Sequence, residues 1–344
     1  MIQIIVGDTL TQLNKIIAES IQCVVTSPPY WGLRDYGMDG QIGLEETPAA
    51  YVEKIVDVFR EVRRVLKKDG TCWLNLGDSY YTSAGGSSKT STTGNRKANA
   101  ELGRRSLPKH SMLKPKDLVG IPWRVAFALQ ADGWYLRQDI IWSKPTPMPE
   151  SVTDRCTKSH EYIFLLTKSE RYFYDAQAIS EPCSVGDCGS SFTSDSDRKT
   201  KSGLGMGPRT PKTWGKHSSE ARQSSGHRMV ENVRRAREEG GTHDAPFGET
   251  RNKRSVWTVP TYPYKGAHFA TFPSDLIRPC ILSGSKEGDT VLDPFGGAGT
   301  TGLVCQEIHR NAILIDINPG YAEMAANRIK NDNPMFSAVS LVCE

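Results

Sequence analysis

An apolar strand near the C-terminus runs into a glycine-rich turn and then into a helical segment that extends through Ile308. The turn lies within Val291–Thr301, and a second apolar strand ends in Asp316 about 20 residues further on. Glycines let a ligand approach the backbone closely, and a carboxylate at this spacing can accept hydrogen bonds from ribose hydroxyls. The series predicts a nucleotide-binding α/β fold. A dehydrogenase would share this fold, but the glycines at 296, 297 and 299 lack the GxGxxG spacing.

A rigid tetrapeptide, Ser27-Pro28-Pro29-Tyr30, directly follows the apolar run Cys23-Val24-Val25. The prolines fix φ and donate no N–H, so the Ser27 hydroxyl and the Pro28 carbonyl can accept hydrogen bonds from an exocyclic NH2 group. Tyr30 adds a ring face on which a base can stack. The tetrapeptide could also be a loop that only ends a strand. The cofactor-type turn in the same chain favours a site for a planar amine.

Together these segments resemble the amino-methyltransferases that act on DNA. In that family an SPPY-type tetrapeptide holds the target amine and an FxGxG loop holds S-adenosylmethionine. The tetrapeptide lies near the N-terminus here and the glycine loop near the C-terminus, which resembles the circularly permuted beta class. Further matching segments are Val6-Gly7-Asp8, Trp142-Ser143-Lys144-Pro145, Met148-Pro149-Glu150, Ser159-His160-Glu161-Tyr162 and Phe272-Pro273. Only the segment from about Glu181 to Ser255 contains no motif typical of the family.

The resemblance implies specific roles for residues of the two segments. The target amine would be held by Ser27, Pro28, Pro29 and Tyr30. S-adenosylmethionine would be bound at its methionine end by the glycine loop, at its ribose by Asp316 and at its adenine amine by Asp8. The expected cofactor-binding residues are Asp8, Phe272, Pro273, Asp293, Phe295, Gly297, Gly299, Thr300 and Asp316. Asp8 could also be an ordinary turn residue, and the family often has Glu at the position of Asp316.

Hydrophobic periodicity predicts strands that alternate with helices. The expected strands are 2–6, 21–27, 71–76, 135–142, 162–166 and the two strands that flank the glycine loop. The expected helices are 10–18, a helix from Thr47-Pro48 to Asp69-Gly70, 118–131 and 274–282. This order predicts a doubly wound, mostly parallel sheet, with both ligand loops at the carboxyl ends of adjacent strands. The resemblance implies a circularly permuted, seven-stranded Rossmann-like methyltransferase sheet with one antiparallel strand near an edge.

The net charge of +4 is distributed unevenly along the chain. Residues 82–116 contain eight Lys or Arg and one acidic residue. Residues 182–255 contain fourteen Lys or Arg and nine acidic residues. Both segments are rich in Ser, Gly and Thr. They are predicted to be a flexible basic loop and a target-recognition insertion, although solvated linkers would have the same composition. The insertion would separate a catalytic half, 1–181, from an S-adenosylmethionine-binding half, 256–344.

The expected partner is double-stranded DNA with the target base flipped out of the stack. Arginines of the insertion could read guanine edges or contact phosphates. The expected DNA-binding residues are Lys89, Arg96, Lys97, Arg104, Arg105, Lys109, Lys144, Arg234, Arg235, Arg237, Arg251, Lys253 and Arg254. A separate cognate restriction endonuclease, and either a monomer or a homodimer, are compatible with the sequence.

Ser before Pro-Pro-Tyr is associated in this family mainly with cytosine N4, and Asp or Asn mainly with adenine N6. The expectation is therefore a cytosine-N4 DNA methyltransferase, with adenine N6 as the alternative. An RNA or small-molecule methyltransferase and an inactive DNA-binding protein are more distant alternatives.

The 344 residues contain no run of about 18 apolar residues and no N-terminal signal pattern, which favours a soluble cytoplasmic protein, bacterial or phage-encoded. Cys183 and Cys188 are the only close cysteine pair. With His217 and His227 they have irregular spacing, so no metal site is expected.

Overall fold

The computed structural model describes residues 1–33, 35–81, 113–182, 250–261, 272–333 and 338–343. The chain divides into two compact units. One unit comprises Met1–Ile179 and Lys253–Glu344, and the other comprises Ser180–Asn252. In the second unit, the short strands β6 (Glu181–Pro182) and β7 (Thr250–Arg251) pair antiparallel. The predicted domain boundaries and the recognition role of 182–255 stay predictions.

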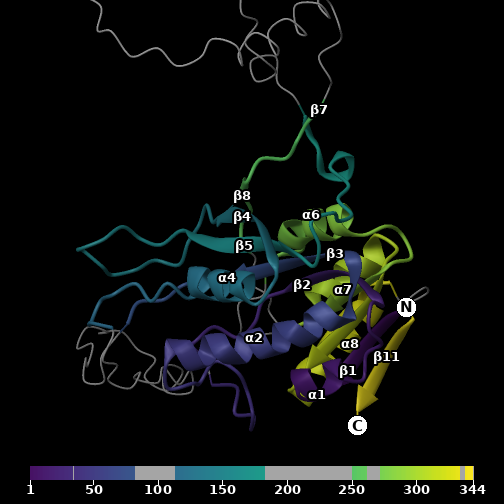
Figure 1. The fold of residues 1–344 in the computed structure, drawn as a ribbon, viewed down its shortest axis with the longest axis horizontal. Helices are drawn as coiled ribbons and strands as arrows, with labels where there is room; N and C mark the ends of the chain where they lie inside the picture. Colours follow the sequence, from purple (N-terminus) through teal and green to yellow (C-terminus); the bar gives the residue numbers. More distant parts are fainter. Residues whose placement is uncertain (34, 82–112, 183–249, 262–271, 334–337, 344) are drawn as a thin grey trace, which may run out of the picture. The chain divides into compact units, whose positions relative to one another are not determined.

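The first unit is built on a sheet of nine described strands in the order β11-β1-β10-β9-β2-β3-β5-β4-β8 (Figure 1). All neighbouring strands are parallel except that β5 runs antiparallel to both β3 and β4. The strands are β1 (Ile2–Val6), β2 (Ile21–Thr26), β3 (Leu66–Leu76), β4 (Tyr135–Ser143), β5 (His160–Thr167), β8 (Val256–Thr258), β9 (Thr290–Asp293), β10 (Asn311–Asp316) and β11 (Val339–Cys343). The predicted fold class is confirmed, and β11 and β8 extend the expected seven strands at the two edges.

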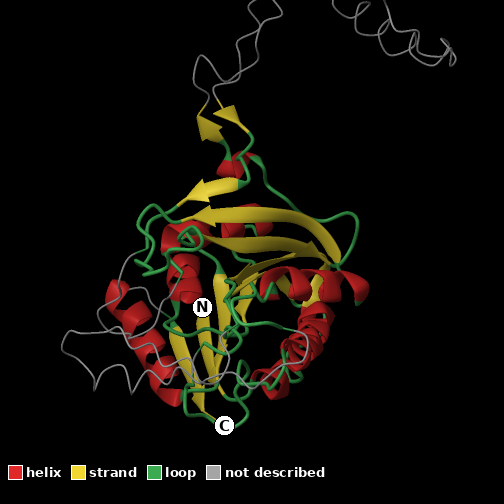
Figure 2. Ribbon diagram, turned by 90° about the vertical axis from the view of Figure 1, so that its left-hand side faces the viewer, coloured by secondary structure: helices red, strands yellow, loops and turns green. Residues whose placement is uncertain are grey.

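Helices cover both faces of the sheet (Figure 2). One cluster of buried side chains joins the sheet to α1 (Thr9–Leu13), α2 (Pro48–Val65) and α4 (Ile121–Ala131). A second cluster joins the opposite face to α6 (Ser274–Gly284), α7 (Thr300–Glu307) and α8 (Pro319–Asp332). The 3-10 helix η1 (Gln177–Ile179) packs near α6. Helices on both faces make the sheet doubly wound, as the alternation of strands and helices predicts.

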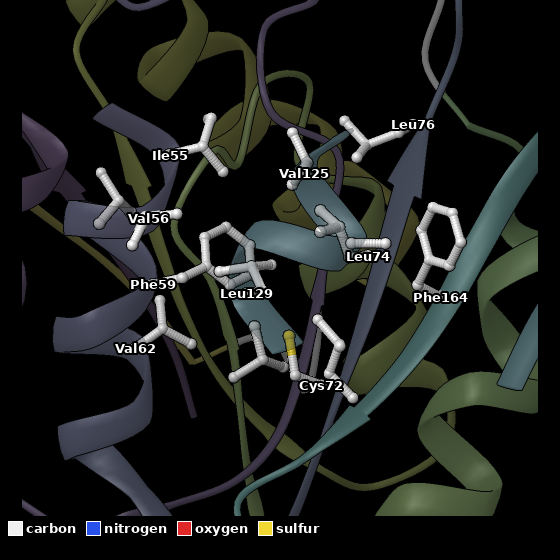
Figure 3. Close-up of a cluster of buried hydrophobic side chains, with 14 of the residues drawn as sticks. Ile55, Val56, Phe59, Val62, Cys72, Leu74, Leu76, Val125, Leu129 and Phe164 are labelled. Atoms are coloured by element: carbon white, nitrogen blue, oxygen red, sulfur yellow. The ribbon is translucent and has the colours of Figure 1, made fainter. Parts of the chain in front are cut away.

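The period of two along β3 determines which side chains enter each cluster. Cys72, Leu74 and Leu76 point toward α2 and α4, where they meet a stripe of α2 side chains that includes Phe59 (Figure 3). Trp73 points to the other face and belongs to the second cluster. Because this part of β3 is buried on both faces, three apolar residues, Cys72, Trp73 and Leu74, follow one another instead of alternating with polar residues.

The beginning of α2 follows its sequence signal, but its end does not. The Thr47 hydroxyl accepts a hydrogen bond from the Ala50 N–H at 3.1 Å, and a proline occupies the first helical turn. The predicted end at Asp69-Gly70 is wrong. Leu66 is already extended, with φ −69° and ψ 135°, and pairs with Ile21, so β3 begins there.

Other boundaries also differ from those predicted. Helix α1 ends at Leu13, five residues before the predicted end at 18, and α4 begins at Ile121, because the preceding Gly120 has φ +76° and cannot continue a right-handed helix. Sequence periodicity did not identify α8 or β11.

The carboxyl ends of four adjacent parallel strands form one edge of the sheet. Strands β2 and β9 pair at Val24 and Leu292, which confirms that the strands before the two ligand loops are neighbours. Strand β10 pairs with β9 at Asp293, and β1 pairs with β10 at Asp316. In open α/β sheets this edge is where ligands bind. The tetrapeptide, the glycine loop and two carboxylates therefore come to one place.

Candidate active site

The glycine loop between β9 and α7 is pressed against the sheet and open on its other side. A Cβ at Gly296 would lie 2.9 Å from the Leu314 Cβ, and one at Gly299 would lie 2.7 Å from the Ala325 Cβ. At Gly297, whose φ is +48°, the nearest atom would be the Phe295 carbonyl oxygen at 4.0 Å. The open backbone at Gly297 would let a ligand approach it, which fits a cofactor lying on the loop.

Asp316 ends β10 beside this loop. One carboxylate oxygen accepts the Gly297 N–H at 2.9 Å, and the other accepts the Asn318 N–H at 2.8 Å. Burial raises the pKa of this half-buried carboxyl above its usual value, while the two N–H groups lower it. A carboxylate has about four lone-pair sites, so each oxygen retains capacity to accept from a hydroxyl.

Asp293, at the end of β9, is only 1% exposed, and its carboxylate accepts hydrogen bonds within the protein. Oδ1 accepts from the Thr26 hydroxyl at 2.7 Å and the Phe295 N–H at 3.1 Å, and Oδ2 accepts from the Thr301 hydroxyl at 2.6 Å. Burial raises its pKa to about 6, and these three donors limit the rise. Asp293 therefore lies within the framework that supports the loop.

Two further side chains, which the sequence did not indicate, hold the loop. The Thr9 hydroxyl donates to the Pro294 carbonyl at 2.8 Å. The Arg328 guanidinium on α8 donates to the Ala298 carbonyl and to the Thr300 hydroxyl, both at 3.0 Å. The loop is thus tied to helices on both faces of the sheet.

The remaining predicted cofactor residues surround this framework. Asp8 is exposed and caps α1, because its Oδ1 accepts from the Thr11 N–H at 2.9 Å and from the Thr11 hydroxyl at 2.8 Å. Phe272 packs against the second buried cluster, and Pro273 occupies the N-cap position of α6. Phe295 packs against the first cluster. The roles of these residues toward a cofactor stay predictions.

The tetrapeptide begins directly after β2, with Ser27 half-exposed and Pro28 buried. Within the described ranges no donor reaches the Pro28 carbonyl, whereas the Pro29 carbonyl accepts from the Tyr51 hydroxyl at 2.9 Å. The Ser27 hydroxyl lies 3.5 Å from the Tyr30 hydroxyl. Two acceptors, the Ser27 oxygen and the Pro28 carbonyl, are thus available at the end of the strand.

The Tyr30 hydroxyl belongs to a polar network that the sequence did not predict. It donates to Glu161 Oε2 at 2.8 Å and lies 3.3 Å from Asn75 Oδ1. The Asn75 amide also donates to Glu161, and the Lys144 ammonium pairs with the other Glu161 oxygen. Burial, followed by the negative charge of Glu161, raises the pKa of the Tyr30 hydroxyl well above its usual value. The Tyr30 hydroxyl therefore keeps its proton as a hydrogen-bond donor, with Glu161 as the nearer acceptor.

The Tyr30 ring itself lies against backbone. A Cβ at Gly77, just after β3, would come within 2.6 Å of Tyr30 Cε2. The absence of a side chain at Gly77 leaves room for the ring. The next residue, Trp31, is a buried core residue whose indole N–H donates to the Glu45 carbonyl at 2.9 Å.

Few of the predicted DNA-binding residues fall within the described ranges. Lys144 pairs with Glu161 and lies 4.2 Å from the centre of the Trp142 ring. The Lys253 ammonium lies 5.2 Å from the centre of the Trp257 ring, and the Arg254 carbonyl accepts from the Trp257 indole N–H at 2.6 Å. Arg251 pairs with Glu181 at 3.6 Å. Outside the described residues lie Lys89, Arg96, Lys97, Arg104, Arg105, Lys109, Arg234, Arg235 and Arg237.

The described residues contain neither a cluster of side chains that could bind a metal nor a helix that could span a membrane. No three His, Cys, Asp or Glu side chains gather there as a metal would require, and Cys183, Cys188, His217 and His227 lie outside the described residues. No helix in the described ranges has the length and apolar character needed to cross a bilayer.

Comparison with solved structures gives the same fold. A protein of Thermus thermophilus, assigned as a DNA modification methylase and solved with S-adenosyl-L-methionine, matches with a TM-score of 0.54 at 22% identity, covering 99% of this chain and 100% of that one. The PvuII DNA methyltransferase, described as cytosine-N4-specific, matches with a TM-score of 0.55 at 19% identity, covering 96% of this chain and 86% of that one.

Sequence comparison identifies the family. The DNA methylase family model for N6 and N4 methyltransferases matches residues 21–327. The Type II methyltransferase M.Cfr9I of Citrobacter freundii is 43% identical, over 95% of this chain and 87% of that protein. M.XycI of Xanthomonas campestris pv. cyanopsidis is 45% identical, with the same coverage of both chains. The chain therefore belongs to the S-adenosylmethionine-dependent DNA methyltransferases of the N4 and N6 amino-methyltransferase family.

Proposed function

We propose that this DNA methyltransferase methylates the N4 amine of a cytosine that is flipped out of double-stranded DNA at a defined sequence. The observation that carries the proposal is the pairing of β2 with β9. It brings the acceptors of Ser27 and Pro28 next to the strand that leads into the glycine loop. Serine in the first position of the tetrapeptide supports cytosine over adenine.

The proposed role of the tetrapeptide follows from the chemistry of the amine. S-adenosylmethionine, when bound, supplies a methyl group on a positively charged sulfur. The amine is a weak nucleophile because its lone pair is delocalised into the ring. Acceptors at Ser27 and Pro28 would hold its hydrogens so that the lone pair becomes available. Neutral serine is a weak base, so most of the acceleration would come from aligning the reacting atoms at about 3–3.5 Å.

Tyr30 would bind the flipped base by stacking. Within a duplex the amine is paired and stacked, so the base has to leave the helix before it can reach the tetrapeptide. The ring of Tyr30 is fixed at its edge by Gly77 and at its hydroxyl by Glu161. A fixed ring provides a preformed surface, because no side-chain rotation then has to be frozen when the base arrives.

We further propose that the basic segments 82–116 and 182–255 hold the duplex and that 182–255 selects the sequence. Their excess of Lys and Arg supports this role, because each neutralised phosphate steepens the salt dependence of binding. The similarity to Type II methyltransferases supports a separate endonuclease that cleaves the same sequence. The cytoplasmic location and the monomeric or dimeric state stay predictions.

Base identity is tested by methylating DNA with labelled S-adenosylmethionine, digesting it and separating the nucleosides by mass spectrometry. N4-methylcytosine is expected, whereas N6-methyladenine would replace the proposal with its alternative. Ser27→Ala should lower kcat with little change in the affinity for cofactor or DNA. Ser340→Ala, on the exposed outer strand β11, is the control and should leave kcat unchanged. Equal losses of binding and rate in Ser27→Ala would indicate a structural turn.

A further inference from the structure

A buried carboxylate joins the strand of the tetrapeptide to the strand of the glycine loop. Asp293 is the last residue of β9, and Thr26 is the last residue of β2. Their side chains form a hydrogen bond of 2.7 Å between residues 267 positions apart in the sequence. Thr26 and Thr301, which donate to the two oxygens of this carboxylate, are both 0% exposed. The three side chains therefore form one water-excluded link.

This link lies where the backbone connection between the two strands has ended. The β2–β9 pairing comprises Cys23 with Val291 and Val24 with Leu292. Thr26 lies two residues beyond the last pair, and Asp293 one residue beyond it. The bond between their side chains thus extends the connection past the ladder, up to the residues that directly precede Ser27 and the glycine loop.

We propose that Asp293 is a positioning residue that fixes the distance between the target amine and the cofactor methyl group. The proposal rests on the proposed function. Asp293 Oδ1 holds Thr26, whose planar peptide bond leads directly into Ser27. The same oxygen accepts the Phe295 N–H of the loop, and Oδ2 holds Thr301 in the first turn of α7. One carboxylate thus contacts both halves of the site.

The chemistry makes this distance important. A misplacement of about 1 Å between reacting groups can lower a rate by roughly a hundredfold. A buried carboxylate that accepts three hydrogen bonds is held firmly, because losing one of the donors leaves part of a desolvated charge uncompensated. A link of this kind acts on the rate of methyl transfer, while each ligand still binds its own half of the site.

The experiment compares two substitutions of the same residue. Thr26→Val keeps the shape and removes the hydroxyl, and Thr26→Ser keeps the hydroxyl and removes a methyl group. In the full chain we expect Thr26→Val to lower kcat about tenfold. Its Kd for S-adenosylmethionine, measured by calorimetry without DNA, should remain within about twofold, because no cofactor contact is removed. Thr26→Ser should retain most of the kcat of the unmodified enzyme.

Three outcomes would overturn the proposal: an unchanged kcat in Thr26→Val, equal loss of kcat in both variants, or equal loss of kcat and cofactor affinity in Thr26→Val. A double-mutant cycle of Thr26→Val and Asp293→Asn, in which the free energy of unfolding is measured in urea, tests the link independently of enzyme activity. Non-additive effects are expected, and additive effects would contradict the link. Failure of the unmodified enzyme to methylate DNA would instead refute the proposed function.

Discussion

The two halves of the site are held by different kinds of interaction. At the cofactor edge, defined as Asp293, the loop 295–299 and Asp316, the carboxylates accept from backbone N–H groups and from buried threonines. At the target edge, defined as Ser27–Tyr30 with Asn75, Lys144 and Glu161, the contacts run mainly between side chains. Backbone donors are fixed by the fold, whereas a side-chain network can change without altering the sheet. The fold therefore holds the cofactor edge more firmly than the target edge.

The largest effect is expected at the target edge from Glu161→Gln. The amide can still accept from the Tyr30 hydroxyl, but it leaves the Lys144 ammonium, whose side chain is 20% exposed, without its counter-charge. We expect the free energy of unfolding to fall by roughly 2–4 kcal/mol, because removing one partner of a mostly buried ion pair is costly. Methylation of DNA should fall while the calorimetric Kd for S-adenosylmethionine is retained.

The control for this variant is Glu307→Gln, which breaks a more exposed ion pair with Arg278. Exposed pairs contribute about 0–1 kcal/mol, so urea unfolding of this control should be nearly unchanged. If Glu161→Gln weakened cofactor binding as much as it slowed methylation, the two edges would not be separable.

The second prediction concerns the cofactor edge. Asp316→Asn should weaken S-adenosylmethionine binding by roughly 1.5–3 kcal/mol, since hydrogen bonds to a charged acceptor are strong. Burial raises the pKa of Asp316, so its charge is lost at a higher pH than the charge of an exposed aspartate as the pH falls. The affinity of the unmodified enzyme for S-adenosylmethionine should therefore decrease as the pH is lowered from 8 to 5. The affinity of the Asp316→Asn variant should lack the part of this pH dependence that comes from Asp316.

Calorimetry across this pH range measures both effects. Asp332→Asn, at the exposed end of α8, is the matched control and should keep the affinity and the pH dependence of the unmodified enzyme. An Asp316→Asn variant with unchanged affinity would remove Asp316 from the cofactor site.

The smallest effects are expected from a pair of glycine substitutions, one at each edge. An added Cβ at Gly77 would press on the Tyr30 ring, and one at Gly296 would press on Leu314 beneath the glycine loop. Overpacking costs about 1–3 kcal/mol, less where a side chain can shift. Gly77→Ala should slow methylation with the cofactor Kd unchanged, and Gly296→Ala should mainly weaken cofactor binding. The prediction is checked by measuring kcat and the Kd for S-adenosylmethionine in both variants. If both variants changed kcat and Kd in the same way, the two edges would not be independent.

Sequence predicts those parts of the fold whose signals are local. The apolar strands on both sides of the glycine loop, and the Thr47-Pro48 start of α2, are each specified by neighbouring residues. The end of α2 is not, because Leu66 continues the helical spacing of apolar residues. Its conformation is decided by pairing with Ile21, a contact that no periodicity reveals.

The same reason explains what sequence missed at the site. Glu161 belongs to a family-like segment, but its partners Tyr30, Asn75 and Lys144 come from other parts of the chain. Asp293 is recognisable as part of the cofactor loop, whereas its bond to Thr26 depends on the adjacency of β2 and β9. Resemblance indicates which residues gather at the edge, and the structure is needed to show which of them touch.

The position of β9 and β10 between β1 and β2 has a consequence for synthesis on the ribosome. The first two strands to emerge cannot pair with each other in the final sheet. Both keep open edges until residues 290–316 have been translated. Unpaired strand edges attract other chains, and a contact that closes such a long loop forms slowly. Nascent chains of this enzyme should therefore need protection by chaperones until residues 290–316 have been synthesised, and a fragment that ends before these residues would lack the cofactor edge of its site.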